Sequence, residues 1–83
     1  MDVLETIRRE ARSHRTVVIE GHELDGSRES REVEPYSLRD GPHGPRLMFW
    51  CLKRNAMRSL LVANLTAAAA TGRPFQPRYT VEL

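Results

Sequence analysis

Two basic residues follow a tryptophan closely in the second half of the chain, where Lys53 and Arg54 come after Trp50. Arginine carries a planar fork of N–H donors that matches phosphate and stacks on bases. Basic residues beside aromatic rings therefore suit the binding of a single nucleic-acid strand. The competing interpretation is a turn that only keeps the domain soluble. Tyr36 also has two interpretations, because its ring either stacks on a base or packs at the rim of the core.

The charged residues are distributed unevenly along the sequence. Residues 1–45 contain seven Lys/Arg and ten Asp/Glu, whereas residues 46–83 contain six Lys/Arg and one Asp/Glu. The first part thus carries a net charge of −3 and the second a net charge of +5. A basic half favours an anionic ligand or nucleic acid, and the alternative is a solvated face without a partner.

The sequence lacks the residue patterns that a metal site or an enzyme active site requires. His14, His22 and His43 have no metal-ligand spacing, and a zinc site needs about four convergent ligands. No arrangement of nucleophile, base and acid can be identified. We therefore expect no metal, no cofactor and no enzymatic activity. The single Cys51 cannot form an internal disulfide, which favours the reducing cytoplasm.

The length and composition indicate one small folded domain over residues 1–83. The chain is 40% hydrophobic and 29% charged, as in ordinary soluble domains. No apolar run approaches the ~20 residues that span a bilayer. Asp2 and Glu5 near the start, without an apolar segment, argue against a secretory signal and against membrane association.

The first part of the chain predicts a helix and then strands. Val3, Leu4, Ile7 and Ala11 share one helical face after Asp2, so residues 2–13 are predicted to form an amphipathic helix. Residues 16–20 are rich in β-branched side chains and predict a strand. Asp25-Gly26 is a hairpin turn signal. The return strand, residues 30–34, is predicted to stop at Pro35, although Tyr36 and Leu38 continue the extended stretch.

The second part has two clear strands and one ambiguous segment. After the loop of residues 40–45, the apolar run of residues 47–52 predicts a strand buried on both faces, with Trp50 in the core. Residues 57–62 are its expected partner. Residues 60–70 favour helix because of their four consecutive alanines. The alternating Tyr79, Val81 and Leu83 suggest a last strand.

Several of these segments together resemble the WYL domain family. Ser30–Leu38 resembles the family's central hairpin, with its pattern Arg-x-Val-x-Pro-Tyr-x-Leu. Leu47–Cys51, Lys53-Arg54 and Met57–Leu60 resemble its next strand, basic turn and following strand. Thr71–Phe75 matches the usual ending, so the resemblance covers roughly residues 2–77.

The resemblance implies a mainly β fold, a small SH3-like or Sm-like curved antiparallel sheet or barrel of about five strands behind an N-terminal α-helix. The sheet would span about residues 15–83, and residues 60–70 would be a short strand and loop rather than a helix. Such domains usually serve as sensory parts of bacterial transcription regulators or defence systems. The family's DNA-reading module is expected to be absent here, because only about 13 residues precede the first strand.

The resemblance also implies a ligand site, because Arg31 and Arg58 stand where the family carries ligand-facing arginines. With Arg54 and Tyr36 they form the expected site for a nucleotide or single-stranded nucleic acid, in a regulatory module that acts alone or through a partner regulator protein. The alternative for Arg31 is an ion pair with Glu29 or Glu32.

A second functional hypothesis is a protein-interaction or self-assembly module without a nucleic-acid ligand. Where the family has charged residues, this chain has the aliphatic stretch Leu60–Leu65. An aliphatic edge on so small a domain needs covering, which predicts a homo-oligomer.

Overall fold

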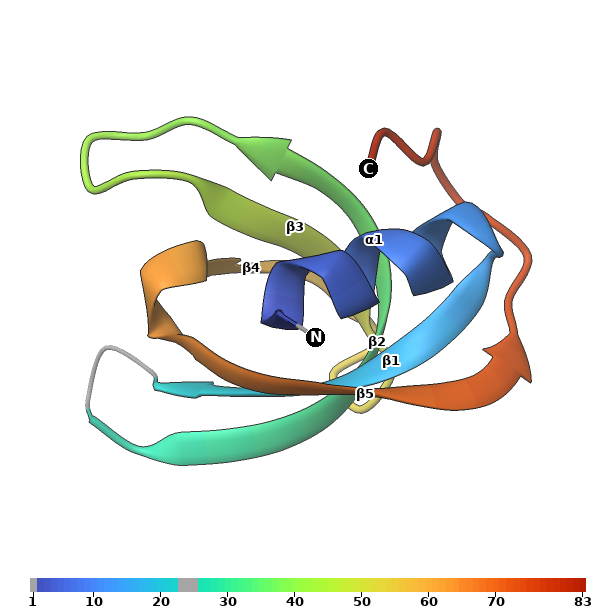
Figure 1. The fold of residues 1–83 in the computed structure, drawn as a ribbon, viewed down its shortest axis with the longest axis horizontal. Helices are drawn as coiled ribbons and strands as arrows, with labels where there is room; N and C mark the ends of the chain where they lie inside the picture. Colours follow the sequence, from blue (N-terminus) through green and yellow to red (C-terminus); the bar gives the residue numbers. More distant parts are fainter. Residues whose placement is uncertain (1, 23–25) are drawn as a thin grey trace.

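The computed structural model describes residues 2–22 and 26–83. Within them, the elements in chain order are α1 (Val3–Arg12), β1 (Arg15–His22), β2 (Arg28–Arg39), β3 (Arg46–Cys51), β4 (Ala56–Leu61), η1 (Val62–Asn64) and β5 (Leu65–Pro74). The five strands form one antiparallel, strongly curved sheet in the order β4-β3-β2-β1-β5 (Figure 1). The predicted mainly β fold with an N-terminal helix is confirmed. Asp25, half of the predicted turn, lies outside the described residues.

The helix α1 forms where its apolar stripe predicts it. The Asp2 carboxylate caps it by accepting the N–H of Leu4 at 2.8 Å. Ile7 and Ala11 are completely buried, whereas Arg8 on the opposite face is exposed. α1 contacts β5, β1 and β2, so it covers the inner face of the curved sheet (Figure 1).

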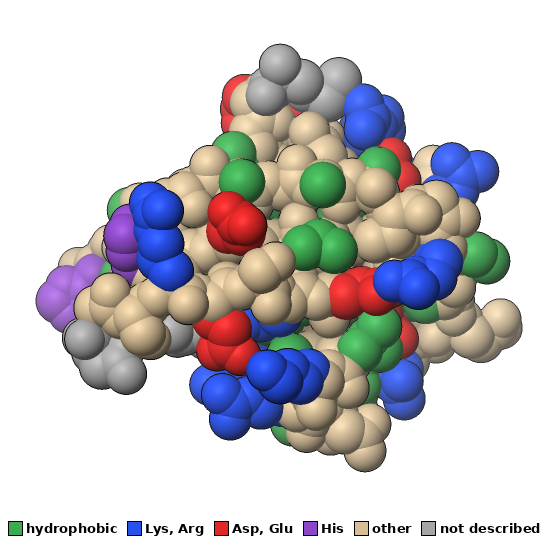
Figure 2. Space-filling model, turned by 90° about the horizontal axis from the view of Figure 1, so that it is seen from below, with side chains coloured by type: hydrophobic (Ala, Val, Ile, Leu, Met, Phe, Trp, Pro, Cys, Tyr) green, Lys and Arg blue, Asp and Glu red, His purple; other side chains and the backbone are tan. Residues whose placement is uncertain are grey.

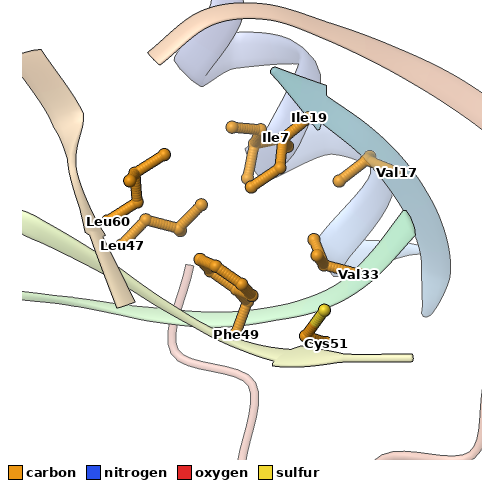
Figure 3. Close-up of a cluster of buried hydrophobic side chains, with 8 residues drawn as sticks. All are labelled: Ile7, Val17, Ile19, Val33, Leu47, Phe49, Cys51 and Leu60. Carbon is orange, nitrogen blue, oxygen red and sulfur yellow. The ribbon is translucent and has the colours of Figure 1, made fainter. Parts of the chain in front are cut away.

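The core lies between α1 and this inner face. It contains eight buried side chains from the helix and from four strands, namely Ile7, Val17, Ile19, Val33, Leu47, Phe49, Cys51 and Leu60 (Figure 3). In β3 only alternate residues are fully buried, so the prediction of a strand buried on both faces is wrong. Trp50 belongs to the other, outer face and is only partly buried, which corrects its expected place in the core.

The strand β2 does not stop at Pro35 as predicted but continues to Arg39. Its pairing with β1 ends at Val33, so Pro35 has no β1 residue opposite that would need its missing N–H. On the other side Pro35 pairs with Phe49, and the register then shifts before Ser37. The proline thus marks the end of one ladder and not the end of the strand.

The alanine run is part of the ten-residue strand β5. Its pairing with β1 and the helix packed on it override the helix propensity of alanine, as the family resemblance implied. The strand is longer than that resemblance suggested. The short η1 before it brings Asn64 near Gly21, where an added Cβ would lie 2.5 Å from Leu60 Cδ2 and 2.9 Å from the Asn64 carbonyl oxygen.

The last segment, residues 75–83, which we call the tail, is irregular, so the predicted final strand is wrong. Pro74 and Pro77 have no N–H with which to continue the ladder. The segment crosses β2 and is held mainly by side chains. Leu60 is buried and Leu65 packs against the core, so much of the aliphatic stretch is used inside the domain.

Neither a membrane-spanning helix nor a cluster of metal-binding side chains is present in the described part of the chain. Its one α-helix is too short and too polar to cross a membrane. Residues 2–22 and 26–83 contain no group of three or more His, Cys, Asp or Glu side chains placed to hold a metal ion.

Candidate ligand-binding site

Two of the predicted arginines lie on the inner face of the sheet. Residues directly opposite in an antiparallel pair share one face. Arg31 is opposite the core residue Ile19, and Arg58 is opposite the core residue Phe49. Both arginines therefore lie on the same face as the core residues and next to Phe49. The Arg31 guanidinium lies over the Phe49 ring, 6.0 Å from its centroid.

Arg31 is held in a largely buried position, because the residue is only 5% exposed. Its guanidinium donates to Glu29 Oε2 at 2.9 Å. Burial lowers the pKa of the Arg31 guanidinium, and the charges of Arg58 and Arg54 lower it further, against an opposing effect of Cys51. An arginine remains charged even so. A positive charge is thus kept in a poorly hydrated place, with two more positive charges near it.

One carboxylate is shared by several cations at this site. Glu29 lies 3.8 Å from Lys53 Nζ and 3.7 Å from the Arg54 guanidinium, besides its bond to Arg31. Arg58 forms no ion pair with any residue in the described parts of the chain. Lys53 and Arg54 come from the turn after β3, and Arg58 comes from β4. The group formed by Arg31, Lys53, Arg54, Arg58 and Glu29, which we call the inner arginine cluster, has a formal charge of +3.

A hollow of about 190 Å³ adjoins the cluster on the side of Arg58. It is lined by side chains from β1, β3, β4 and η1, namely His22, Arg46, Arg58, Ser59, Leu60, Leu61 and Asn64. The Arg46 guanidinium donates to Ser59 Oγ at 3.0 Å, so its direction is fixed. Sites for drug-sized ligands measure roughly 300–1,000 Å³. The hollow is therefore large enough for one phosphate or one ring and too small to enclose a dinucleotide.

Tyr36, the fourth predicted site residue, lies apart from the arginines. It is 2% exposed and its hydroxyl donates to Glu34 Oε1 at 2.6 Å, on the outer face. Burial raises the pKa of Tyr36 to about 12, and the neighbouring Glu34 acts in the same direction. The rings of Phe75 and Tyr79 meet it edge-on, at centroid distances of 5.8 and 5.4 Å. Its ring is not accessible for stacking.

The sequence predicted three of the arginines in this cluster but not the carboxylate of Glu29 as their shared partner. Glu29 was considered only as an alternative ion-pair partner of Arg31, and that pair is present together with the grouping of the arginines. The signal was the spacing of Glu29 and Arg31, two positions apart on one strand, which puts both on one face. His22, Arg46 and Asn64 were missed because no local pattern connects them.

The basic side chains do not form one broad patch on the face drawn in Figure 2. In the face drawn in Figure 2, Lys and Arg side chains lie in small groups around the rim, with acidic side chains between them. The candidate site is distinguished by its local excess of positive charge and by the burial of Arg31.

The solved structure of the proteasome accessory factor B/C (PafBC) of Arthrobacter aurescens has the same fold over 88% of this chain, with a TM-score of 0.77 at 16% sequence identity. The matched region is 12% of that protein, so the chain spans a small part of its length. A comparison with curated proteins finds no match. The family model of the WYL domain matches residues 2–70, most of the sequence. The chain therefore belongs to the WYL domain family.

Proposed function

We propose that this chain is a non-enzymatic regulatory module that senses a nucleotide or single-stranded nucleic acid through Arg31, Arg54 and Arg58. The resemblance to WYL domains supports a sensory role in transcription regulation or defence, exercised through a partner regulator protein. The free, buried Cys51 thiol suits a reducing compartment, so we infer a cytoplasmic location.

The observation that carries the proposal is the excess of positive charge around Glu29. Three cations share one carboxylate, Arg58 stands close to them without an ion pair among the described residues, and one of the three, Arg31, is almost buried. A buried charge is stable only when it is well paired. An anionic group beside Arg58 would pair with that arginine, and a second arginine of the cluster would contact its oxygens through charge-assisted hydrogen bonds. The hollow next to Arg58 offers a place for one such group.

The test is the salt dependence of binding to a short single-stranded oligonucleotide. Each phosphate contact on a single strand contributes a slope of about −0.7 to the log–log plot of affinity against salt, so three arginines give roughly −2. The variant Arg58→Ala is expected to weaken binding and to make the slope shallower by about 0.7. The matched control is Arg8→Ala, which removes the same charge from the exposed face of α1.

Binding by Arg8→Ala should equal that of the wild type. An equal loss in the two variants would mean that the whole surface attracts the strand without a site. No measurable binding by the wild type to the oligonucleotide or to a mononucleotide at low salt would refute the proposal. Binding of the mononucleotide alone would restrict the ligand to a single phosphate-bearing unit.

A second candidate function is self-assembly. The aliphatic stretch Leu60–Leu65 that suggested it has Leu60 in the core and Leu65 packed against the core, so only its remaining side chains support assembly.

A further inference from the structure

The hollow beside Arg58 lies along the strand β4, which forms one edge of the sheet. In the strand order β4-β3-β2-β1-β5, β4 has a neighbour on one side only. Four consecutive residues of β4 line the hollow, namely Arg58, Ser59, Leu60 and Leu61. Since consecutive residues of a strand point to opposite faces, the hollow is open to both faces at this edge. We call it, with the seven lining residues given above, the edge hollow.

Two backbone N–H groups of β4 face the edge hollow. In an antiparallel pair, residues that exchange backbone hydrogen bonds alternate with residues that do not. Val62 N–H donates to the Pro45 carbonyl at 3.0 Å in the register of the β3–β4 pair, so Leu60 also bonds across to β3. The N–H groups of Ser59 and Leu61 therefore point away from β3, to the open edge. Backbone N–H groups at the edge of a sheet are suited to bind an anion.

Two arginine side chains supply the positive charge of the edge hollow. Arg46 donates from Nε to Ser59 Oγ at 3.0 Å, and its terminal nitrogens make no hydrogen bond within the described parts of the chain. Arg58 likewise pairs with no described carboxylate, and no acidic side chain is among the described residues that line the hollow. With His22 neutral, the two arginines give the lining a formal charge of +2. The hollow thus combines two unpaired cations with N–H donors.

The edge hollow is closed on the side where β1 meets β4 and η1. At Gly21 the strands approach so closely that an added Cβ would lie 2.5 Å from Leu60 Cδ2 and 2.9 Å from the Asn64 carbonyl oxygen. Leu60, Asn64 and the next residue of β1, His22, all line the hollow. A ligand chain that entered the hollow could therefore not continue past this contact. The end of a chain fits here better than a phosphate from which the chain runs on in two directions.

The edge hollow is continuous with the inner arginine cluster. Arg58 belongs to both, and it is close enough to Arg31 for its charge to help lower the pKa of that guanidinium. A ligand with its last phosphate in the hollow would place its next groups beside Arg31 and the basic turn of Lys53 and Arg54. The hollow and the cluster together can hold the end of a strand and the part that follows it.

We propose that the edge hollow binds a terminal phosphate, so that the site takes phosphate monoesters, namely a nucleoside monophosphate or the phosphorylated end of a single strand. Like other monoesters, a terminal phosphate carries a charge of about −1.5 to −2 at pH 7 and three acceptor oxygens. A phosphate inside a strand carries one negative charge and has two free oxygens. The two arginines and the two N–H groups match the monoester. This inference rests on the proposed function and names the class of ligand within it.

The first experiment compares the ends of otherwise identical oligonucleotides. Calorimetry measures the affinity of one sequence with a 5′-phosphate, with a 3′-phosphate, or with hydroxyls at both ends. We expect one phosphorylated strand to bind at least roughly tenfold more tightly than the unphosphorylated one, as for a hydrogen-bonded charge contact. The end that gives the gain sets the direction of the strand, and an equal gain at both ends supports the terminal phosphate without a direction.

The control is an unphosphorylated strand that is one nucleotide longer, since it carries the added phosphate as a diester. It should bind like the shorter unphosphorylated strand. Equal affinity of the three first strands would overturn this inference and leave the proposed function in place. A gain from the longer strand as large as that from a terminal phosphate would show that only charge counts, and would overturn it too. No binding of any strand or mononucleotide at low salt would overturn both.

The second experiment uses small ligands and a variant of the edge hollow. Adenosine 5′-monophosphate should bind at least roughly tenfold more tightly than the 3′,5′-cyclic monophosphate, whose phosphate is a diester. Arg46→Ala should remove most of this difference, whereas Arg8→Ala on α1 should keep it. Should Arg46→Ala fail to fold by circular dichroism, Arg46→Lys replaces it, because lysine keeps the charge and loses the fork. An undiminished preference in the folded Arg46 variant, or none in the wild type, would overturn the inference.

Discussion

The inner arginine cluster and the pair of Arg78 with Glu34 lie on opposite faces of one sheet and differ in their balance of charge. In the inner arginine cluster, Arg31, Lys53 and Arg54 share Glu29, and Arg58 has no carboxylate among the described residues. On the outer face, Arg78 and Glu34 form a one-to-one pair that is completed by Tyr36 and Trp50.

This difference in charge balance indicates whether each site stabilises the domain or attracts an anion. A one-to-one ion pair stabilises the contact in which it lies and has little charge left to attract an added ion. An unbalanced group keeps an attraction for an anion, at some cost to the stability of the unliganded domain. The two faces are thus expected to respond in opposite ways to the loss of a charge.

The largest effect is expected from Arg78→Ala. It leaves the buried Glu34 carboxylate with the hydroxyl of Tyr36 but without its cation. Because breaking a buried pair leaves an uncompensated charge, we expect a loss of about 3 kcal/mol in the free energy of unfolding by urea. The double variant Arg78→Ala with Glu34→Gln should recover part of this loss. A loss below about 0.5 kcal/mol would remove the distinction between the two faces.

A second effect of about 2 kcal/mol is expected from ionisation of Tyr36 at high pH. Its pKa is raised from 10.0 to about 12 in the folded protein. Below pH 10 the phenol is protonated in both states, and its contribution to stability is complete and constant. Between pH 10 and 12 only the unfolded state ionises, so stability falls; a shift of one pKa unit corresponds to about 1.4 kcal/mol.

The measurement is the free energy of unfolding from pH 9 to 12 in the wild type and in Tyr36→Phe. The variant should lose the part of the pH dependence that is due to Tyr36, and the remaining pH dependence should be common to both proteins. Parallel curves for the two proteins would contradict the assignment.

Glu29→Gln is expected to have two smaller effects of opposite sign, a loss of stability and a gain in affinity for the oligonucleotide. Arg31 loses its 2.9 Å ionic bond, so stability should fall by about 1 to 2 kcal/mol. The oligonucleotide, however, should bind more tightly, since the competing carboxylate is gone and the cluster gains positive charge. Added inorganic phosphate should restore part of the stability. If binding weakened together with stability, Glu29 would be part of the ligand site and not its competitor.

The smallest effect is expected from Arg39→Ala on the exposed pair with Glu82, whose side chains are 60% and 48% exposed. Exposed ion pairs contribute little because water screens them and both side chains lose freedom. Unfolding in urea should change by less than about 0.5 kcal/mol. A much larger loss would show that the end of the tail, and not Arg78, fastens it.

The elements that sequence reasoning predicted correctly are those with a local signal. Asp2 and the stripe of Ile7 and Ala11 defined the helix, and the β-branched and apolar runs defined β1 and β3. The errors concern segments decided by distant partners. The four alanines lie in a strand because β1 and α1 hold them there, and the tail is irregular because its prolines and its side-chain contacts outweigh its alternation.

The residues of the candidate site could be predicted where they lie on, or next to, strands that pair with one another. Arg31, Arg54 and Arg58 were found from the pattern of the family, and pairing of β2, β3 and β4 explains why they meet. Tyr36 was misplaced in this scheme because its partner, Arg78, is 42 residues away in the sequence. Nothing near Glu34 in the sequence indicates that a cation from the tail will pair with it.

The pairing of β1 with β5 has a consequence for how the chain comes to fold. Val17 on β1 lies opposite Ala70 on β5, so the two strands that pair here are separated by most of the chain. Contacts of such long sequence separation form slowly, because a long loop has to close before they are gained. During synthesis from the N-terminus, β1, β2 and β3 can already pair while one edge of β1 remains open. That edge is exposed to wrong partners until residues 65–74 have left the ribosome, so the edge of β1 is protected only after the last strand of this domain has been synthesised.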